Sequence, residues 1–216
     1  MESLALPEPP RSQRERAKHD RRRRIVDAAH DLLRDGSPDD LSGKAIAARA
    51  GVSLSTLYNL FGSKDAVLVA VYDDDLAKFE ALVRAHPTKG GLARLFEAVD
   101  VAITLYADDP AFYRATMWRR APDGALDAAV RQPRARFWEA LVDRAQAEGA
   151  LRKPIDTAAL ARLLVYIYGG ALSDWVADEL TLEMLARDVT FGFASALLPY
   201  ATRAAQVDLR HRLEAL

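Results

Sequence analysis

Apolar residues recur at intervals of three and four along most of the chain, which is the spacing of a buried face on an α-helix. The pattern predicts a first helix that starts at about Glu15 or Arg21 and ends at Arg34, before a Gly-Ser-Pro loop. Shorter apolar stripes and a longer one follow, over about 45–50, 57–61 and 67–83. The longer one is expected to begin after Ser63, a residue that can cap a helix, and to end near His86.

The same spacing continues through the second half of the chain and predicts five more helices. Their approximate ranges are 92–106, 110–122, 125–148, 156–175 and 182–197. Pro110 stands at the first position of its helix, where proline is tolerated, whereas Pro133 lies inside a helix and predicts a kink or a split there. No segment alternates apolar and polar residues as a half-buried strand does, so the sequence predicts an all-α protein.

Residues 41–64, LSGKAIAARAGVSLSTLYNLFGSK, read as two short helices joined by a tight turn. Ser42 and Ser53 can cap the two helices through their hydroxyl groups, and Gly51 provides the backbone freedom that the turn requires. In the second helix Leu57 and its apolar neighbours at i+3 and i+4 can face inward. The outer side is then mostly small or hydrogen-bonding, which suits the major groove of DNA. It consists of Leu54, Ser55, Thr56, Tyr58 and Asn59.

The run IAARAGVSLSTLYNLFGSKDAVL resembles the DNA-binding signature of the TetR/AcrR family of one-component regulators. In that family an alanine-glycine-valine-serine turn leads into a threonine-leucine-tyrosine recognition helix, and a phenylalanine followed by serine-lysine completes the motif. The resemblance in motif covers roughly residues 22–71. The chain departs from the pattern at Asn59 and Leu60, where the family often has histidine or tyrosine, and at Ala45, where it often has an acidic residue.

The resemblance implies an N-terminal three-helix helix-turn-helix domain over 21–63, which binds double-stranded operator DNA, and a larger helical domain over 64–216 for ligand binding and dimerisation. It implies a ligand-responsive transcriptional regulator, with a repressor favoured over an activator. By resemblance, Tyr58 and Lys64 hold phosphates, while Thr56 and Asn59 read base edges. The residues expected to contact DNA are Ser42, Lys44, Ser53, Leu54, Ser55, Thr56, Tyr58, Asn59, Lys64, Arg21 and Arg22.

The net charge of −1 conceals an uneven distribution. Up to Lys64 the chain has 12 Lys and Arg against 9 Asp and Glu, whereas the remainder has 18 against 22. Most of the early cationic residues fall between Arg11 and Arg24. Because phosphate attracts such residues within a Debye length of about 8–10 Å, residues 1–20 are predicted to form a flexible basic arm that contacts DNA. A solvated tail without specific contacts is the alternative.

Composition narrows the class of protein further. Half of the residues are hydrophobic, yet no apolar run approaches the ~20 residues that span a bilayer, and the start of the chain lacks the apolar segment of a secretory signal. The absence of cysteine excludes disulfide and thiolate chemistry. A cytoplasmic protein without a membrane partner is therefore expected.

Aromatic residues are concentrated on the predicted helices between about 92 and 175. In relatives these helices surround the effector cavity, so a largely hydrophobic small-molecule effector is expected to bind there. The candidate residues are Phe96, Ile103, Tyr106, Tyr113, Met117, Trp118, Phe137, Trp138, Tyr166 and Trp175. For each one taken singly, an ordinary place in the core is the competing interpretation. Four arginines on the same helices could instead bind the carboxylate of an acidic effector, although exposure at the surface is the simpler interpretation. They are Arg94, Arg114, Arg119 and Arg120.

The last two predicted helices, 156–175 and 182–197, are apolar around more than one stripe and carry small residues that let backbones approach. Two such helices from each of two subunits make a four-helix bundle, and reading two DNA half-sites requires two copies. A homodimer is therefore expected, and core helices of a monomer are the alternative. The predicted interface residues are Leu164, Tyr168, Leu172, Val189, Phe193 and Leu197.

The sequence offers little for catalysis. The four histidines are scattered, and no zinc-protease motif, nucleophile elbow or phosphate-binding glycine loop is present. The consecutive residues Asp73, Asp74 and Asp75 point about 100° apart on a helix, so a solvated face is expected rather than a metal site. No catalytic residue, metal site or cofactor is predicted. Two rivals to the regulator are a helical enzyme that uses these carboxylates and an architectural DNA-binding protein without an effector.

Overall fold

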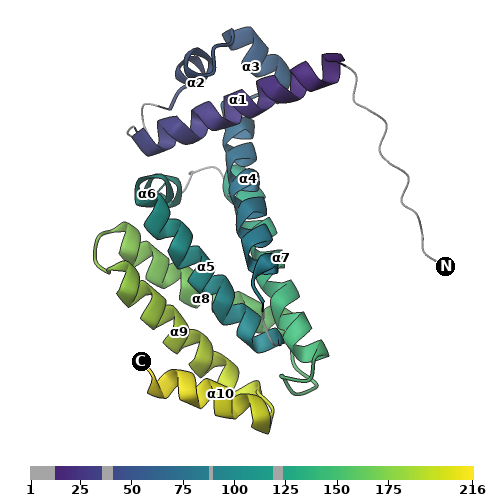
Figure 1. Cartoon of the computed structure of the whole chain (residues 1–216), viewed down its shortest axis with the longest axis vertical. Coiled ribbons are helices and arrows are strands. Elements are labelled where there is room, and N and C mark those ends of the chain that lie inside the picture. Colours follow the sequence, from purple (N-terminus) through teal and green to yellow (C-terminus); the bar gives the residue numbers. More distant parts are fainter. Residues whose placement is uncertain (1–12, 36–40, 88–89, 119–123) are drawn as a thin grey trace, which may run out of the picture. The chain divides into compact units, whose positions relative to one another are not determined.

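The computed structural model describes residues 13–35, 41–87, 90–118 and 124–216, apart from the side chains of 117–118 and 124–131. It divides into two compact units, Met1–Val71 and Tyr72–Leu216, and the boundary falls inside one helix. In the described ranges all regular structure is helical apart from one isolated antiparallel bridge between Leu151 and Ala201 (Figure 1). The prediction of an all-α fold is therefore confirmed.

The first unit contains α1 (Gln13–Asp35), α2 (Gly43–Arg49), α3 (Leu54–Phe61) and the beginning of α4 (Lys64–Ala85). Its core is the stripe that the sequence pattern predicts. The most deeply buried residues are Ile25, Ala29, Leu33, Ile46, Leu57 and Val67. Residues 13–20 were assigned to the flexible arm, but they form the first turns of α1, because Arg, Glu, Ala and Lys favour helix and no Gly or Pro interrupts them.

The second unit contains the rest of α4 and the remaining helices. These are α5 (Gly91–Asp108), α6 (Pro110–Trp118), α7 (Gly124–Ala147), α8 (Thr157–Val176), α9 (Leu182–Leu197), the 3-10 helix η2 (Leu198–Tyr200) and α10 (Arg203–Glu214). The predicted start of α6 at Pro110 is confirmed, and α7 runs through Pro133 as one helix rather than two. The sequence did not predict α10, because it buries only Ala205 and Leu209 and so lacks a continuous apolar stripe.

Helix packing in the second unit is centred on α8, which contacts α7 on one side and α9 on the other, while α9 also contacts α5 and α10. A Cβ added at Gly192 of α9 would collide with the side chain of Ile167 in α8, so this glycine permits the close approach of the two helices. Gly169 and Gly170 have open space where a side chain would extend. No helix of the described residues is both long and apolar enough to cross a bilayer.

Candidate functional site

The segment from α2 to α4 has three serine caps and one left-handed turn. Ser42 Oγ accepts a hydrogen bond from the Ala45 N–H at 3.1 Å, Ser53 Oγ accepts one from the Thr56 N–H at 3.1 Å, and Ser63 Oγ accepts one from the Ala66 N–H at 3.0 Å. Gly51 adopts a φ of +63° between α2 and α3, a conformation that glycine takes without strain. These contacts confirm the three predicted caps and the predicted turn, which are the local features of a helix-turn-helix.

The outer side of α3 is open to solvent. Ser55 and Asn59 are exposed, and the side chains of Leu54 and Tyr58 remain 41% and 44% exposed. Leu57, one turn away, is completely buried. The helix therefore separates an inward apolar side from an outward polar side, as the sequence pattern predicted. Lys44 of α2 is also exposed, and Lys64, at the first position of α4, is half-buried.

Two residues in this segment have roles that the sequence did not reveal. The Ser53 hydroxyl lies 2.9 Å from Ser55 Oγ and 2.8 Å from Thr56 Oγ1, so it is occupied by its own helix while it also caps α3. Gly43 of α2 is buried, and a Cβ there would lie 3.0 Å from the Tyr58 hydroxyl oxygen. Glycine at this position therefore lets the exposed ring of Tyr58 lie close to α2.

Arg22 has a contact inside the DNA-binding unit that the sequence did not predict. Its Nη1 donates a hydrogen bond to the carbonyl oxygen of Leu60, and its guanidinium carbon lies 4.1 Å from the centre of the Phe61 ring. Leu60 and Phe61 end α3, where helix carbonyls lack partners within the helix. The structure thus gives Arg22 a role in holding the end of α3, and its contact with DNA stays a prediction. Arg21 is half-buried, and residues 1–12 of the predicted arm lie outside the described residues.

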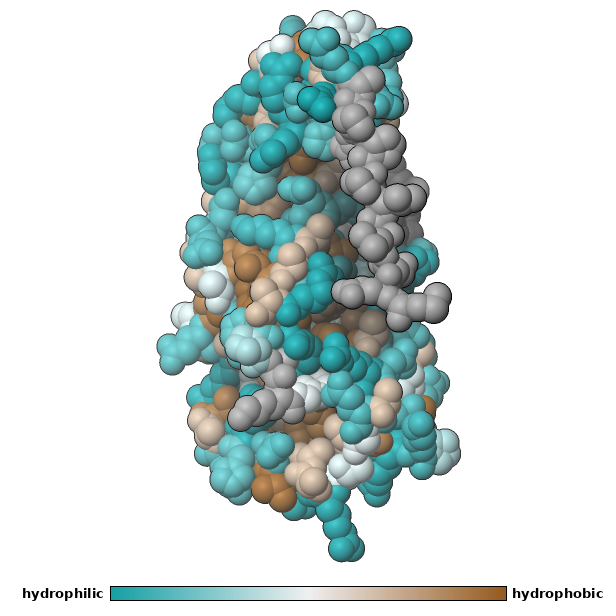
Figure 2. Space-filling model, turned by 45° about the vertical axis from the view of Figure 1, so that its right-hand side comes forward, coloured by the Kyte–Doolittle hydropathy of each residue, from teal (hydrophilic) through white to brown (hydrophobic). Residues whose placement is uncertain are grey.

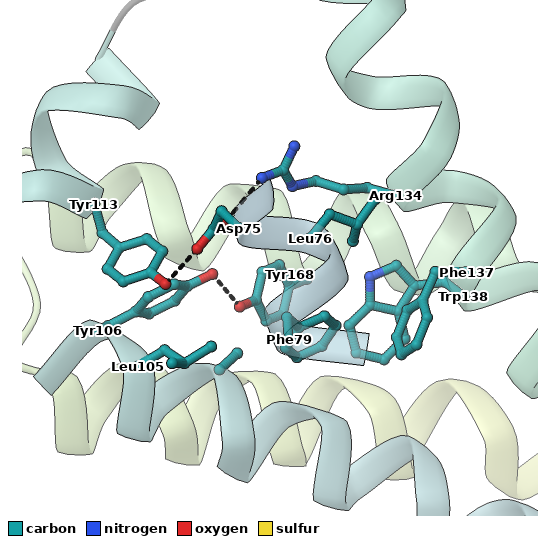
Figure 3. Close-up of a pocket in the computed structure, with 11 residues that line it drawn as sticks. Asp75, Leu76, Phe79, Leu105, Tyr106, Tyr113, Arg134, Phe137, Trp138 and Tyr168 are labelled. Carbon is teal, nitrogen blue, oxygen red and sulfur yellow. Dashed lines mark hydrogen bonds and ion pairs between the residues drawn. The ribbon is translucent and has the colours of Figure 1, made fainter. Parts of the chain in front are cut away.

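The second unit encloses a cavity between α4, α5, α6, α7 and α8, all of which contribute side chains to its wall. One part of the wall is apolar and mostly aromatic, with Leu76, Phe79, Leu105, Phe137 and Trp138 (Figure 3). Phe137 meets Phe79 edge to face at 5.0 Å and Trp138 at 5.5 Å, so these rings form one continuous surface. The free space between the side chains amounts to about 50 Å³.

The other part of the cavity wall is polar and is centred on Asp75 of α4. Its carboxylate accepts a hydrogen bond from the Tyr113 hydroxyl at 2.6 Å and lies 3.3 Å from Nη2 of Arg134 (Figure 3). The Tyr106 and Tyr168 hydroxyl oxygens lie 2.5 Å apart beside this cluster. Asp75 therefore connects α4 with α6 and α7, and the carboxylate and guanidinium balance each other in charge.

Burial keeps the three tyrosine hydroxyls protonated. Burial raises the pKa of Tyr106 to about 12, and it also raises the pKa of Tyr168 well above its usual value. The pKa of Tyr113 is raised by burial first and by the negative charge of Asp75 second. At neutral pH all three groups are therefore neutral and able to donate a hydrogen bond.

Comparison with known proteins places the chain in a family. Residues 25–71, which span most of α1 to the start of α4, match the family described as bacterial regulatory proteins, tetR family. The transcriptional repressor KstR of Rhodococcus jostii is 28% identical over 181 residues, which cover 80% of this chain and 85% of the repressor. The chain carries the DNA-binding domain of the TetR family.

Solved structures share the fold beyond the DNA-binding segment of this TetR protein. The full-length regulator TylP of Streptomyces fradiae superposes with a TM-score of 0.65 at 26% identity, covering 89% of this chain and 92% of TylP. FadR of Thermus thermophilus, a repressor in complex with lauroyl-CoA, superposes with a TM-score of 0.66 at 21% identity, covering 84% and 96% of the two chains. The relatives are regulators and not enzymes, so this TetR protein is a DNA-binding transcriptional regulator. That conclusion removes the helical enzyme from consideration.

The cavity of the TetR protein includes only part of the predicted effector set. Tyr106, Tyr113, Phe137 and Trp138 line it. The predicted residues that lie elsewhere are Phe96, Ile103, Tyr166 and Trp175. Phe96 and Trp175 are core residues, since they are 2% and 1% exposed, whereas Tyr166 is 72% exposed. The side chains of Met117 and Trp118 lie outside the described part of the chain.

The predicted interface residues are mostly buried within this TetR chain itself. Leu164, Val189, Phe193 and Leu197 are completely buried, and Leu172 is 8% exposed, so they have little surface left for a partner. Tyr168 lines the cavity. The prediction chose the strongest apolar stripe of each helix, and that stripe faces the core of the chain. Large apolar residues do reach the surface of α8 and α9, at Leu163, Tyr166, Met184 and Phe191.

The sequence pattern missed the charged pair of the cavity, Asp75 and Arg134. Asp73 and Asp74 are exposed, as predicted, but the side chain of Asp75 is only 14% exposed and that of Arg134 is 26% exposed. The sequence offered only a weak indication of this burial. Asp75 lies between the exposed Asp74 and the buried Leu76, at the edge of the buried side of α4. Arg94 also departs from its expected exposure, since it donates hydrogen bonds to the carbonyls of Val83 and His86.

Proposed function

We propose that this protein is a homodimeric repressor that leaves its operator when a largely hydrophobic small molecule binds in the cavity around Asp75. The observation that carries the proposal is the composition of the cavity, which combines an aromatic wall with a buried, hydrogen-bonded carboxylate. A mostly apolar pocket with a few convergent polar groups is typical of a small-molecule site. The cytoplasm is the compartment in which such a regulator meets its DNA.

On the DNA side, we assign base reading to the exposed outer side of α3. We assign base edges to Asn59, which is exposed, and to Thr56, which is half-buried, and a phosphate to the hydroxyl of Tyr58, a residue that is 44% exposed. Lys64 stands at the N-terminus of α4, where its charge and the helix dipole both favour a phosphate. Lys44 and Ser55 are exposed beside these positions and complete the surface.

Release would begin with α4. This helix starts at Lys64 in the DNA-binding unit and carries Asp75 in the ligand unit, so both functions act on one element. The free space of about 50 Å³ is well below the roughly 150 Å³ of a cavity that holds benzene, so a ligand must displace part of the wall. Displacement alters the contacts of Asp75 with α6 and α7, and a ligand that prefers the altered state shifts the protein from its operator by its differential affinity.

The dimer surface is proposed to be the exposed side of α8 and α9. Apolar side chains reach the molecular surface in patches bordered by hydrophilic ones (Figure 2). On these two helices the exposed large residues are Leu163, Tyr166, Met184 and Phe191. Gly169 and Gly170 of α8 have open space around them, which leaves room for the backbone of a second copy. Two copies would read two half-sites one helical turn apart.

The known ligand of a structural neighbour agrees with the apolar part of the proposal. FadR of Thermus thermophilus, which has the same fold, is in complex with lauroyl-CoA, a ligand with a long apolar chain. This likeness supports only the capacity of the fold to hold an apolar ligand. The identity of the effector of this protein must come from its own cavity.

The proposal is tested by selecting operator sequences from random DNA duplexes and then measuring release by compounds that stabilise the protein in a thermal-shift screen. We expect a two-half-site sequence to be enriched, and Asp75→Asn to change the ligand concentration that releases DNA. Asp73→Asn makes the same change at an exposed position of α4 and serves as the matched control. Enrichment of no sequence would favour the architectural DNA-binding protein, and equal effects of the two variants would exclude the cavity as the effector site.

A further inference from the structure

The pair of tyrosine hydroxyls in the cavity, Tyr106 and Tyr168, has one proton that no described residue accepts. Tyr106 and Tyr168 are joined by one hydrogen bond between their hydroxyl oxygens, 2.5 Å apart, and this bond uses one of their two hydroxyl protons. Among the described residues, neither hydroxyl has a second hydrogen bond. Whichever tyrosine donates to the other, the second O–H remains available beside the cavity. A donor of this kind needs an acceptor, because a buried polar group without one costs stability.

The pair is held firmly in place. The Tyr106 ring is 5% exposed and stacks on Trp175 with ring centres 5.3 Å apart and planes 14° from parallel. The Tyr168 ring packs against Trp138 at 5.7 Å. Burial keeps both groups protonated, since it raises the pKa of each. The free O–H is therefore a fixed, neutral donor that lines the same space as the aromatic wall.

The charges nearby restrict what can accept this proton. Asp75 and Arg134 form an ion pair in the cavity wall, with 3.3 Å between carboxylate oxygen and guanidinium nitrogen (Figure 3). Because these two charges already balance each other, a charged group of a ligand would be buried there without an opposite charge to compensate it. A neutral oxygen avoids this cost. The aromatic wall, with Phe79, Phe137 and Trp138, favours a ring that can stack or meet it edge to face.

Building on the proposed effector site, we propose that the ligand is an uncharged, ring-bearing molecule whose carbonyl or hydroxyl oxygen accepts a hydrogen bond from the Tyr106–Tyr168 pair. The aromatic wall holds the rings, and the tyrosine pair selects for the oxygen. Because the Asp75 and Arg134 charges already balance each other, charged analogues of the same shape would lose their hydration without gaining a counter-charge. This inference rests on the proposed function in one respect, which is that the cavity binds the effector.

The test uses four naphthalene compounds of similar shape that differ in one group. They are 2-acetonaphthone, 2-ethylnaphthalene, 2-naphthoate and a (2-naphthylmethyl)trimethylammonium salt. Calorimetric titration of the full-length protein should give the tightest binding for the ketone, about 3- to 10-fold tighter than the hydrocarbon, which is the range for one net hydrogen bond. The two charged compounds should bind more weakly than the ketone.

The variants exploit the redundancy of the pair. Tyr106→Phe and Tyr168→Phe each leave one hydroxyl that can donate, so each single variant should keep the preference for the ketone. The double variant removes both hydroxyls and should bind the ketone and the hydrocarbon alike. Tyr200→Phe changes an exposed tyrosine outside the cavity and should behave as the unmodified protein. Circular dichroism and melting curves establish that each variant is folded.

Several outcomes would overturn the inference. These are equal affinity of the unmodified protein for ketone and hydrocarbon, tighter binding of either charged compound, a retained ketone preference in the double variant, and binding of none of the four. Operator release, measured with the same compounds, separates this inference from the proposed function. Release without the ketone pattern refutes the inference alone, whereas the ketone pattern without release refutes the regulatory proposal alone.

Discussion

Replacing Arg22 by alanine distinguishes a residue that holds α3 from one that holds DNA. The change removes a charged hydrogen bond to the Leu60 carbonyl and a cation–π contact with Phe61. Such hydrogen bonds are worth about 1.5–3 kcal/mol and exposed cation–π contacts about 0.5–1 kcal/mol. Because Leu60 and Phe61 are only half-buried, water replaces part of the loss, and a net cost of about 1–2 kcal/mol to local stability is expected.

Hydrogen exchange and DNA binding measure the two roles separately. A cost of 1–2 kcal/mol corresponds to exchange of the α3 amides about 5–30 times faster, whereas operator affinity should change little as long as α3 is folded in most molecules. The salt slope of binding should stay unchanged, because no phosphate contact is lost. Arg23→Ala is the matched control, since the Arg23 side chain is 76% exposed and its pair with Asp27 is 3.9 Å long. It should leave the exchange of α3 unchanged.

The opposite result is equally clear. If Arg22→Ala left the exchange of α3 unaltered and lowered the salt slope by about 0.9, Arg22 would be bound to a phosphate. The reasoning from the contacts of Leu60 and Phe61 would then be refuted, and the assignment of Arg22 to the DNA surface would be supported.

Three further predictions concern the recognition surface, the α8–α9 packing and the dimer. Lys64→Ala should weaken binding to all DNA sequences alike and lower the salt slope by about one unit. Asn59→Ala should relax the preference at one base position, at a cost of roughly 1–3 kcal/mol. Binding to an operator library measures both effects, and an equal loss of sequence preference in the two variants would contradict the assignment. Gly192→Ala should destabilise the protein by about 1–3 kcal/mol in denaturant titrations, because the added Cβ collides with Ile167 of α8. Gly170→Ala should be neutral or stabilising in dilute, dissociated protein, because its Cβ would meet open space. Equal free-energy costs for the two variants would show that the collision at Gly192 is relieved. Tyr166→Asp should weaken the dimer in sedimentation experiments and leave the fold intact, since this side chain is 72% exposed; an unchanged association constant would place the interface elsewhere.

The sequence predicted most of the helices because each carries a local signal. These signals depend only on residues close together in the sequence, and the structure contains each of them. They are the caps at Ser42, Ser53 and Asp156 and the proline at the start of α6. Helix α10 was not predicted, because only two of its residues are buried and its apolar pattern is therefore weak. The periodic pattern also cannot say whether a buried stripe faces the core of the chain or another copy, and the predicted interface residues, such as Phe193, were misplaced for that reason.

The cavity was predictable in its aromatic residues and not in its charged pair. Tyr106, Phe137 and Trp138 were expected from the concentration of rings on the central helices. The pairing of Asp75 with Arg134 joins residues 59 positions apart, and no local pattern specifies such a contact. It arises only when α4 and α7 pack together, so it belongs to the tertiary structure rather than to any segment.

The aspartate triplet of α4 consists of three identical residues in two different environments. Two of them face water, where substitution is expected to change little beyond surface charge. The third, Asp75, contacts Tyr113 and Arg134 in the cavity wall. Under the proposed function, a single substitution at Asp75 would change which compounds release the protein from DNA, while the residues proposed to read the operator stay the same.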